Sequence, residues 1–188
     1  ERKGGEAVIR EDYCHAVEHS IEFQVLFLQH ICGPQVCVLP LLCGSYGRSL
    51  MDGCRPEDDP AVAQFLAALR EMALREGGRL FWVLGVDMAH IGRRYGHSFA
   101  AEARRGALKE VEEADLARIA RLEAADADGF WEEVRREGDP LHWCGAAPLY
   151  TFLRAAPGAR GELLRYEQWN IDEASVVSFA ALAFARSA

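Results

Sequence analysis

The chain has 188 residues and a formal net charge of -8 at pH 7, with 50% hydrophobic and 27% charged residues. This length and composition are typical of one folded domain with a sizeable core, and they exclude a disordered chain. The negative charge disfavours nucleic acid as a partner, because phosphate binding needs a basic surface. No apolar run reaches the roughly 18 residues of a membrane span, and no basic segment precedes a short apolar one as in an export signal. We therefore expect a cytoplasmic protein without a membrane partner.

The six cysteines predict reduced thiols rather than disulfides. None belongs to a C-x-x-C pair, and chains that depend on disulfides are usually shorter and exported. Cys32, Cys37 and Cys43 lie in or beside apolar segments, where we expect small buried residues. Cys144 stands apart from them, in a polar and aromatic neighbourhood beside Gly145.

The first apolar run, at residues 18–29, has the spacing of a helix. Ile21, Val25 and Leu28 recur on one stripe, which we expect to be buried. Ser20 can cap the first turn of this helix. His19 then lies beside that turn, where a ring nitrogen can point into a cleft.

Further along the chain, hydrophobic periodicity predicts four more helices and four strands, with a loop at residues 45–59. The expected helices cover residues 61–75, 98–123, 126–136 and 146–155. The expected strands cover residues 36–44, 79–86, 163–169 and 176–184. The first two strands are continuous apolar runs, which are typical of a parallel sheet covered on both faces. The alternation predicts a single α/β domain with a mostly parallel or mixed central sheet.

The beginning of the chain is abrupt. Residues 1–5 are polar and glycine-containing, and no apolar strand precedes the helix that begins near His19. An α/β domain normally starts with a strand that leads into such a helix. We therefore expect that an N-terminal portion of the domain is missing from this chain.

Asp87 and His90 follow directly on the strand expected at residues 79–86. In open α/β sheets, ligands bind beyond the carboxyl ends of the strands. A histidine there can act as an acid or base near neutral pH, and a carboxylate three residues away can orient it. The alternative is that Asp87 caps a turn and His90 is an ordinary loop residue. Spacing alone does not separate these two interpretations.

Two further groups can carry chemistry. Cys144 can offer a thiolate to iron, copper or zinc, or it can be a buried structural cysteine. Residues 15–19 have the form H-x-x-E-H, in which two histidines on one helix face bind zinc, as in a class of metallopeptidases. The peptidase interpretation needs a third ligand on a following helix. We favour the alternative, in which His15 lies at the surface and His19 acts alone or is a hydrogen-bonded core residue.

Five segments resemble, in order, the signature segments of the Memo family. They are EHSIEFQVLFLQ at residues 18–29, VLPLLCG at 38–44, GVDMAHIG at 85–92, CGAAP at 144–148 and SVVSFAA at 175–181. The chain departs from the family pattern at Leu26, Gly85, Val86 and Ile91, none of which is a matched ligand position.

This resemblance implies a three-layer α/β/α domain like that of class III extradiol dioxygenases of the LigB type. It implies a non-haem metal cleft with His19 and Cys144 as ligands, His90 as the acid/base, and Asp87 beside it. Iron or copper is the expected metal, and zinc is possible. The family's other histidine ligand belongs to an N-terminal motif that this chain lacks. The metal site is therefore expected to be one ligand short, and it can be empty in this chain.

The resemblance implies two functions. The first is oxidative chemistry on a small molecule at the metal. The second is that of a peptide-binding module, because animal Memo proteins are adaptors for phosphotyrosine peptides and the same cleft can hold a peptide without chemistry. A zinc peptidase is the third and least favoured class.

Overall fold

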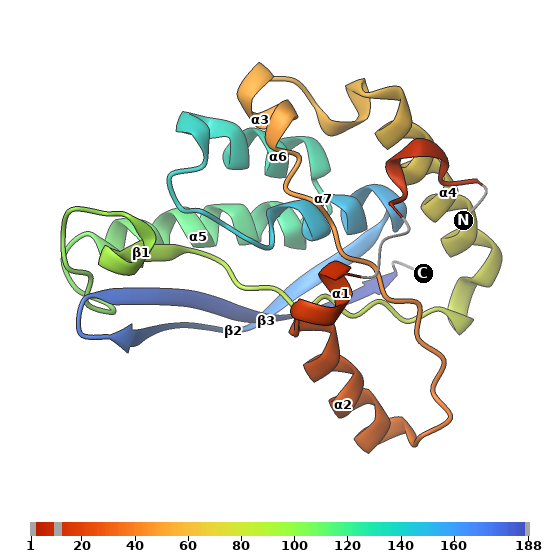
Figure 1. The fold of residues 1–188 in the computed structure, drawn as a ribbon, viewed down its shortest axis with the longest axis horizontal. Helices are drawn as coiled ribbons and strands as arrows, with labels where there is room; N and C mark the ends of the chain where they lie inside the picture. Colours follow the sequence, from red (N-terminus) through yellow and green to blue (C-terminus); the bar gives the residue numbers. More distant parts are fainter. Residues whose placement is uncertain (1–2, 10–12, 187–188) are drawn as a thin grey trace.

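The computed structural model describes residues 3–9 and 13–186 of the chain (Figure 1). The α-helices in these residues are α1 (Tyr13–Val17), α2 (Ser20–Cys32), α3 (Gly47–Asp52), α4 (Pro60–Glu76), α5 (Leu108–Glu123), α6 (Ala127–Arg135) and α7 (Ala146–Ala155). The strands are β1 (His90–Gly92), β2 (Ala159–Asp172) and β3 (Ser175–Arg186). No helix in the described ranges is both long and apolar enough to cross a membrane.

The sheet of the described residues is small and antiparallel, with the strand order β1-β3-β2. β2 and β3 form a long hairpin, and Asp172 closes its turn by accepting a hydrogen bond from the backbone N–H of Ala174 (2.8 Å). β1 pairs with the other edge of β3, and this pairing places His90 opposite Val177. β3 is therefore the central strand, with β1 on one edge and β2 on the other.

The core lies between the hairpin and the helices α5, α6 and α7, which Figure 1 shows on one side of the sheet. Local sequence signals position these helices. Asp59 caps α4 by accepting from Ala61 N, and Asp126 caps α6 by accepting from Gly129 N (2.8 and 2.9 Å). The largest fully buried apolar side chains are Trp131, Tyr150, Phe130, Leu108, Ile119, Leu122, Val134 and Val176.

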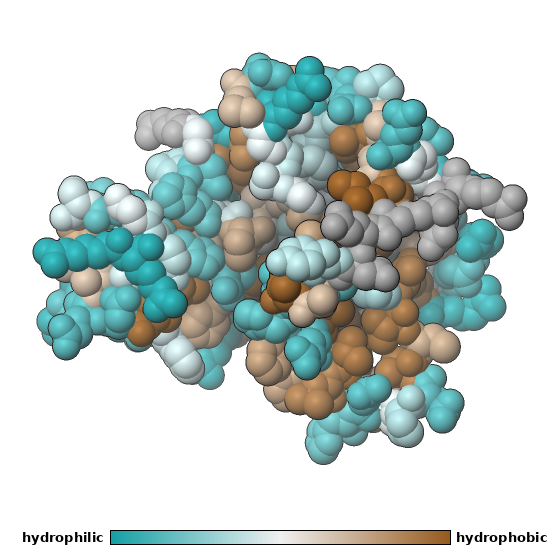
Figure 2. Space-filling view, viewed as in Figure 1, coloured by the Kyte–Doolittle hydropathy of each residue, from teal (hydrophilic) through white to brown (hydrophobic). Residues whose placement is uncertain are grey.

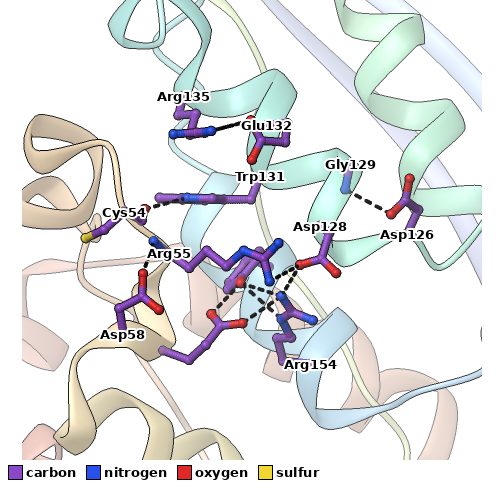
Figure 3. A network of polar contacts seen from close by, with 12 residues as sticks. Cys54, Arg55, Asp58, Asp126, Asp128, Gly129, Trp131, Glu132, Arg135 and Arg154 are labelled. Atoms are coloured by element: carbon purple, nitrogen blue, oxygen red, sulfur yellow. Dashed lines mark hydrogen bonds and ion pairs between the residues drawn. The ribbon is translucent and has the colours of Figure 1, made fainter.

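A polar network ties the segment before α4 to α6 and α7 (Figure 3). Arg154 of α7 reaches both Glu57 and Asp128, each at 2.6 Å, and Arg55 adds a contact to Asp128 at 3.2 Å. Trp131 donates its indole N–H to the carbonyl of Cys54 (2.9 Å). These contacts hold the segment between α3 and α4 against α6 and α7.

Several predicted elements are confirmed. The helices expected at residues 61–75, 126–136 and 146–155 correspond to α4, α6 and α7, and the strands expected at 163–169 and 176–184 lie inside β2 and β3. The helix expected at 98–123 begins only at Leu108, because turns occupy the residues before it. The expected loop at 45–59 contains the short helix α3. The chain thus has a mixed α/β fold.

The strands predicted at residues 36–44 and 79–86 are wrong. Both segments are irregular in the structure, and in the described part of the chain the backbone groups of residues 37–45 and 81–86 form no backbone hydrogen bond. A strand of a parallel sheet is hydrogen-bonded to a neighbouring strand and covered on both faces. No such neighbour lies beside these segments among the described residues, so the predicted parallel sheet and three layers are not formed there.

The stripe predicted for the first helix is less buried than expected, since α2 contains no buried residue and Ile21, Val25 and Leu28 are only half-buried. Phe23, Leu26 and Phe27 are more than half exposed, and Ile31 is 78% exposed. Apolar residues from the two irregular segments are exposed as well, and they are Val38, Leu39, Leu41, Phe81 and Val83. Figure 2 shows the resulting apolar surface over α2. We call this set of nine residues the apolar face.

The cysteines differ from expectation in the same region. Cys32 and Cys37 are exposed rather than buried, and Cys43 is half-buried with its sulfur 3.9 Å from the hydroxyl of Thr151. All six cysteines are free thiols in the structure. Cys32 and Cys37 are exposed because they belong to α2 and to the segment after it, which lack a covering layer in the described residues.

Truncation of two phenylalanines distinguishes the core from the apolar face. Phe130→Ala is expected to lower the free energy of unfolding by about 3–5 kcal/mol, because it opens a cavity at a fully buried site. Phe27→Ala, at a site 62% exposed, is expected to change it by less than about 0.5 kcal/mol. Urea unfolding followed by circular dichroism measures both values. A large loss in Phe27→Ala would contradict the exposure of α2.

Candidate metal centre

Two backbone segments bring the candidate residues together, and we call them the first arm (residues 86–92) and the second arm (residues 141–145). The first arm carries Asp87 and runs into β1 at His90, while the second arm carries Cys144 and leads into α7. His90 N donates to the carbonyl of Leu141 (2.9 Å), and Gly145 N donates to the carbonyl of Asp87 (3.1 Å). The two arms are therefore joined directly, on either side of the candidate side chains.

Gly145 is required by this close approach. A Cβ atom at position 145 would lie 2.8 Å from the carbonyl oxygen of Asp87 and 2.8 Å from Cβ of Val86. Both neighbours belong to the first arm, and at least one of the two contacts is with rigid backbone. The glycine after Cys144 thus allows the second arm to pack against the first.

Asp87, His90 and Cys144 are the one group of at least three possible metal ligands found in the described residues. One ligand atom from each lies within 4.8 Å of the others. The Nε2 atom of His90 is 3.8 Å from Oδ2 of Asp87, and the Cys144 sulfur is 3.5 Å from the carbonyl oxygen of Asp87. The structure therefore brings together three of the four site residues that the sequence predicts.

The environment of His90 fixes which ring nitrogen is free. Nδ1 lies 2.9 Å from the carbonyl oxygen of Met88 and 3.2 Å from that of His142. Carbonyl oxygens only accept hydrogen bonds, so Nδ1 carries the proton and donates it. A neutral ring then leaves the lone pair of Nε2 free, 3.8 Å from Oδ2 of Asp87, as a metal-binding histidine needs.

Negative charge gathers around the thiol of Cys144. Cys144 is an exposed residue, but partial desolvation of its sulfur raises its pKa above the ordinary value. The carboxylates of Asp87 and Glu18 raise this pKa further, and the hydrogen bond to the Asp87 carbonyl opposes them. These acids disfavour a second anion beside them. A bound cation reverses this balance, because it favours the thiolate and is itself attracted by the carboxylates.

A cavity of about 390 Å³ opens beside Asp87 and His90. Its other lining residues are Arg94, Tyr95, Trp169, Ile171, Val177 and Phe179. The ring of Tyr95 meets that of His90 edge to face, with 4.9 Å between their centroids. No sequence pattern singles out these lining residues. Arg94 and Tyr95 directly follow the matched segment at 85–92, whereas Trp169 and Phe179 reach the cavity only through the pairing of β2 with β3.

His19 lies outside the group of three. It is the residue before α2, in a second cavity of about 410 Å³ that is also lined by His15, Glu18 and Glu22. Glu18 accepts hydrogen bonds from the backbone N–H groups of His19 and Ser20 (2.8 and 2.9 Å), and these bonds lower the pKa of Glu18. Glu18, rather than Ser20, therefore caps this helix with its side chain.

The H-x-x-E-H segment does not form a single helix. His15 belongs to α1, which ends at Val17, and α2 begins at Ser20. The two histidines thus lack the continuous helical turn that places residues i and i+4 on one face. The geometry of residues 13–20 gives the zinc peptidase interpretation no support.

Comparison with known proteins agrees with the family resemblance found in the sequence. The profile of a family described as Memo-like protein matches residues 5–183. A MEMO1 family protein of Thermococcus kodakarensis is 27% identical over 186 residues, which cover 94% of this chain and 59% of that protein. Similar proteins of Thermoplasma volcanium and Pyrococcus furiosus are 24% and 26% identical over 87% and 83% of this chain. The chain spans about half the length of these last two relatives, which it covers to 50% and 51%.

The electrostatic role of Asp87 can be tested on the thiol. Asp87→Asn removes a negative charge that raises the pKa of Cys144, so the thiolate fraction at pH 8 is expected to increase. Iodoacetamide should then alkylate Cys144 faster in the variant at pH 8, and the two rates should converge above the pKa. Mass spectrometry of the peptide that contains Cys144 measures the rate. Asp52→Asn is the control, because Asp52 is not among the main influences on this pKa. Equal alkylation rates in Asp87→Asn and in the unchanged protein would contradict the electrostatic role of Asp87.

Proposed function

The chain belongs to the Memo-like protein family, and we propose that it binds one iron or copper ion, with zinc as a possible substitute, through Cys144, His90 and Asp87. The observation that supports the proposal most directly is the approach of their three ligand atoms to within 4.8 Å of one another. The free Nε2 of His90 adds to it, because Nδ1 is engaged by two carbonyl groups.

The chemistry of the donor set fits such an ion. A thiolate sulfur, an imidazole nitrogen and a carboxylate oxygen together suit iron, copper or zinc better than magnesium or calcium, which prefer oxygen ligands. Three protein ligands leave further coordination positions open, as catalytic metal sites require. The proposed centre thus has room for a substrate molecule.

His19 has a different place in the proposal. The resemblance to the Memo family implies that His19 is a ligand and that His90 is the acid/base, whereas the geometry favours His90 as a ligand. Glu18, the neighbour of His19, raises the pKa of Cys144, which supports a place for His19 near the same centre. We propose that His19 is a further ligand.

We propose that the reaction is oxidative chemistry on a small molecule in the cytoplasm, where the thiol of Cys144 stays reduced. A bound iron or copper ion would supply Lewis acidity and one-electron chemistry. The chain supplies the cavity of about 390 Å³ beside His90, in which Arg94 can hold an anionic group. Trp169 and Phe179 offer apolar walls for the rest of the substrate.

One observation also favours the alternative of a peptide-binding module. The cavity combines Arg94 with three aromatic residues, and such a combination suits a phosphotyrosine side chain as well as a small anionic molecule. The two functions differ in their need for metal. A phosphotyrosine peptide that binds saturably at physiological salt, and equally well after chelation, would favour the module over the metal-dependent reaction.

Metal content tests the proposed function. The purified protein, incubated anaerobically with Fe(II) and passed through a desalting column, is expected to retain about one metal ion per chain. Cys144→Ala and His90→Ala are expected to lose at least about tenfold in affinity, because each removes one of few ligands. Elemental analysis and competition with a chromophoric chelator measure occupancy and affinity.

Matched controls make this result specific. Cys37→Ala removes an exposed thiol outside the group of three, and His30→Ala removes a histidine from the end of α2, so both should bind metal normally. His19→Ala decides whether His19 is a ligand. Equal metal retention in Cys144→Ala and in the unchanged protein would refute the proposed centre, and loss of metal in His15→Ala would revive the peptidase interpretation.

A further inference from the structure

Asp115 is an acid at a core position of α5, and its side chain is completely buried. It lies on the same helix face as the buried residues Val111, Ile119 and Leu122. Its carboxylate accepts hydrogen bonds from other parts of the chain and has no role in the centre described above. A buried carboxylate persists only where such bonds satisfy it, because isolated burial of a charge is very unfavourable.

Three side chains bind this carboxylate. The indole N–H of Trp143 donates to Oδ1 (2.6 Å), and the hydroxyl of Tyr166 donates to Oδ2 (2.7 Å). The hydroxyl of Ser178 also interacts with this carboxylate and lowers the pKa of Asp115. Burial raises the pKa of Asp115, and these bonds oppose that rise. The three donors come from the second arm, from β2 and from β3.

Two of these three residues, Trp143 and Ser178, are connected to the candidate metal centre. Trp143 is the residue before Cys144, so its indole anchors the second arm beside the thiol. Ser178 anchors the first arm, because its Oγ accepts from Ala89 N (2.8 Å), and its backbone pairs with Met88 and Ala89 (3.0 Å each). Ala89 lies between the two other ligand residues of the centre.

The third donor, Tyr166, belongs to a set of hydrogen bonds between β2 and α5. The hydroxyl of Tyr166 accepts a hydrogen bond from Nε2 of Gln168 (3.0 Å), and Gln168 also donates to the carbonyl of Leu108 (2.8 Å). These contacts tie β2 to α5 and include no residue of either arm. Tyr166 serves as a comparison, because it donates to the same carboxylate and belongs to neither arm, although its hydroxyl also interacts with Ser178.

We propose that Asp115 is a positioning residue that sets the separation of the two arms, and therefore of Cys144 from Asp87 and His90. One carboxylate holds the second arm through Trp143 and the first arm through Ser178. The part of this inference that concerns metal affinity rests on the proposed function. The part that concerns coupling between the arms holds for the metal-free protein.

The test compares Trp143→Phe, Ser178→Ala and Tyr166→Phe, each of which removes one donor to Asp115. In the metal-free protein, hydrogen exchange is followed in each variant at the opposite arm. Trp143→Phe should speed exchange at the amides of Met88 and Ala89, and Ser178→Ala should speed exchange at Gly145, by about tenfold. Tyr166→Phe should leave both arms within about threefold of the unchanged protein. Unchanged exchange at the opposite arm in both Trp143→Phe and Ser178→Ala would overturn the inference.

Metal affinity gives a second measurement. Loss of a group that orients metal ligands typically lowers affinity 10- to 100-fold, and we expect a loss of about this size for Fe(II) in Trp143→Phe and in Ser178→Ala. Tyr166→Phe should stay within about threefold. Asp115→Asn keeps an acceptor for Trp143, so its Fe(II) affinity should lie between that of Tyr166→Phe and those of the two other donor variants. Losses of affinity in all three donor variants that simply follow their losses in unfolding free energy would reduce Asp115 to a structural residue.

The two proposals fail in different ways. If the unchanged protein binds no metal while exchange at the opposite arms responds as expected, the proposed function fails and the positioning role of Asp115 stands. If metal binds normally in every variant and exchange at the opposite arms is unchanged, the positioning role fails and the metal centre stands.

Discussion

The pairing of the first arm with β3 is the interaction on which the candidate centre depends. The backbone of Ser178 bonds to Met88 and Ala89, and β1 continues this pairing from His90 onward. The second arm is then held against the first by the bonds from His90 to Leu141 and from Gly145 to Asp87. Because the hairpin of β2 and β3 packs on α5 and α7, the position of the three ligand residues is fixed by the core of the molecule rather than by the loops around them.

Sequence alone predicted the elements whose signals are local. Apolar periodicity located α4, α6 and α7 to within a few residues, and the structure adds side-chain caps at Asp59 and Asp126. β2 and β3 were also found, although their antiparallel pairing was not. Periodicity describes the faces of one element, whereas pairing depends on the geometry of a short turn at Asp172 and on residues far apart in the chain.

The parallel strands were predicted wrongly for a related physical reason. Residues 36–44 and 79–86 have the composition of strands inside a sheet, but a segment becomes a strand only when another strand satisfies its backbone groups. The described residues supply no such neighbour, so these apolar segments are irregular and, with α2, form the apolar face. Composition thus indicates that a segment can form a strand, but a neighbouring strand is needed for the strand to form.

The candidate centre was predictable in part. Spacing alone left the roles of Asp87 and His90 open, and only the resemblance to the Memo family connected them with Cys144. The proton on Nδ1 of His90 follows from carbonyl groups of both arms and was not accessible from sequence. Asp115 left a visible signal, since an acid interrupts the apolar stripe of α5, but the sequence does not reveal its three donors.

X-ray absorption spectroscopy at the edge of the bound metal tests the central claim most directly. Coordination by Cys144, His90 and Asp87 predicts one sulfur scatterer at about 2.3 Å and nitrogen or oxygen scatterers at about 2.0–2.2 Å, as in zinc sites with these ligands. The sulfur contribution should disappear in Cys144→Ser. A shell without sulfur in the unchanged protein, or one with several sulfur atoms, would contradict the proposed centre.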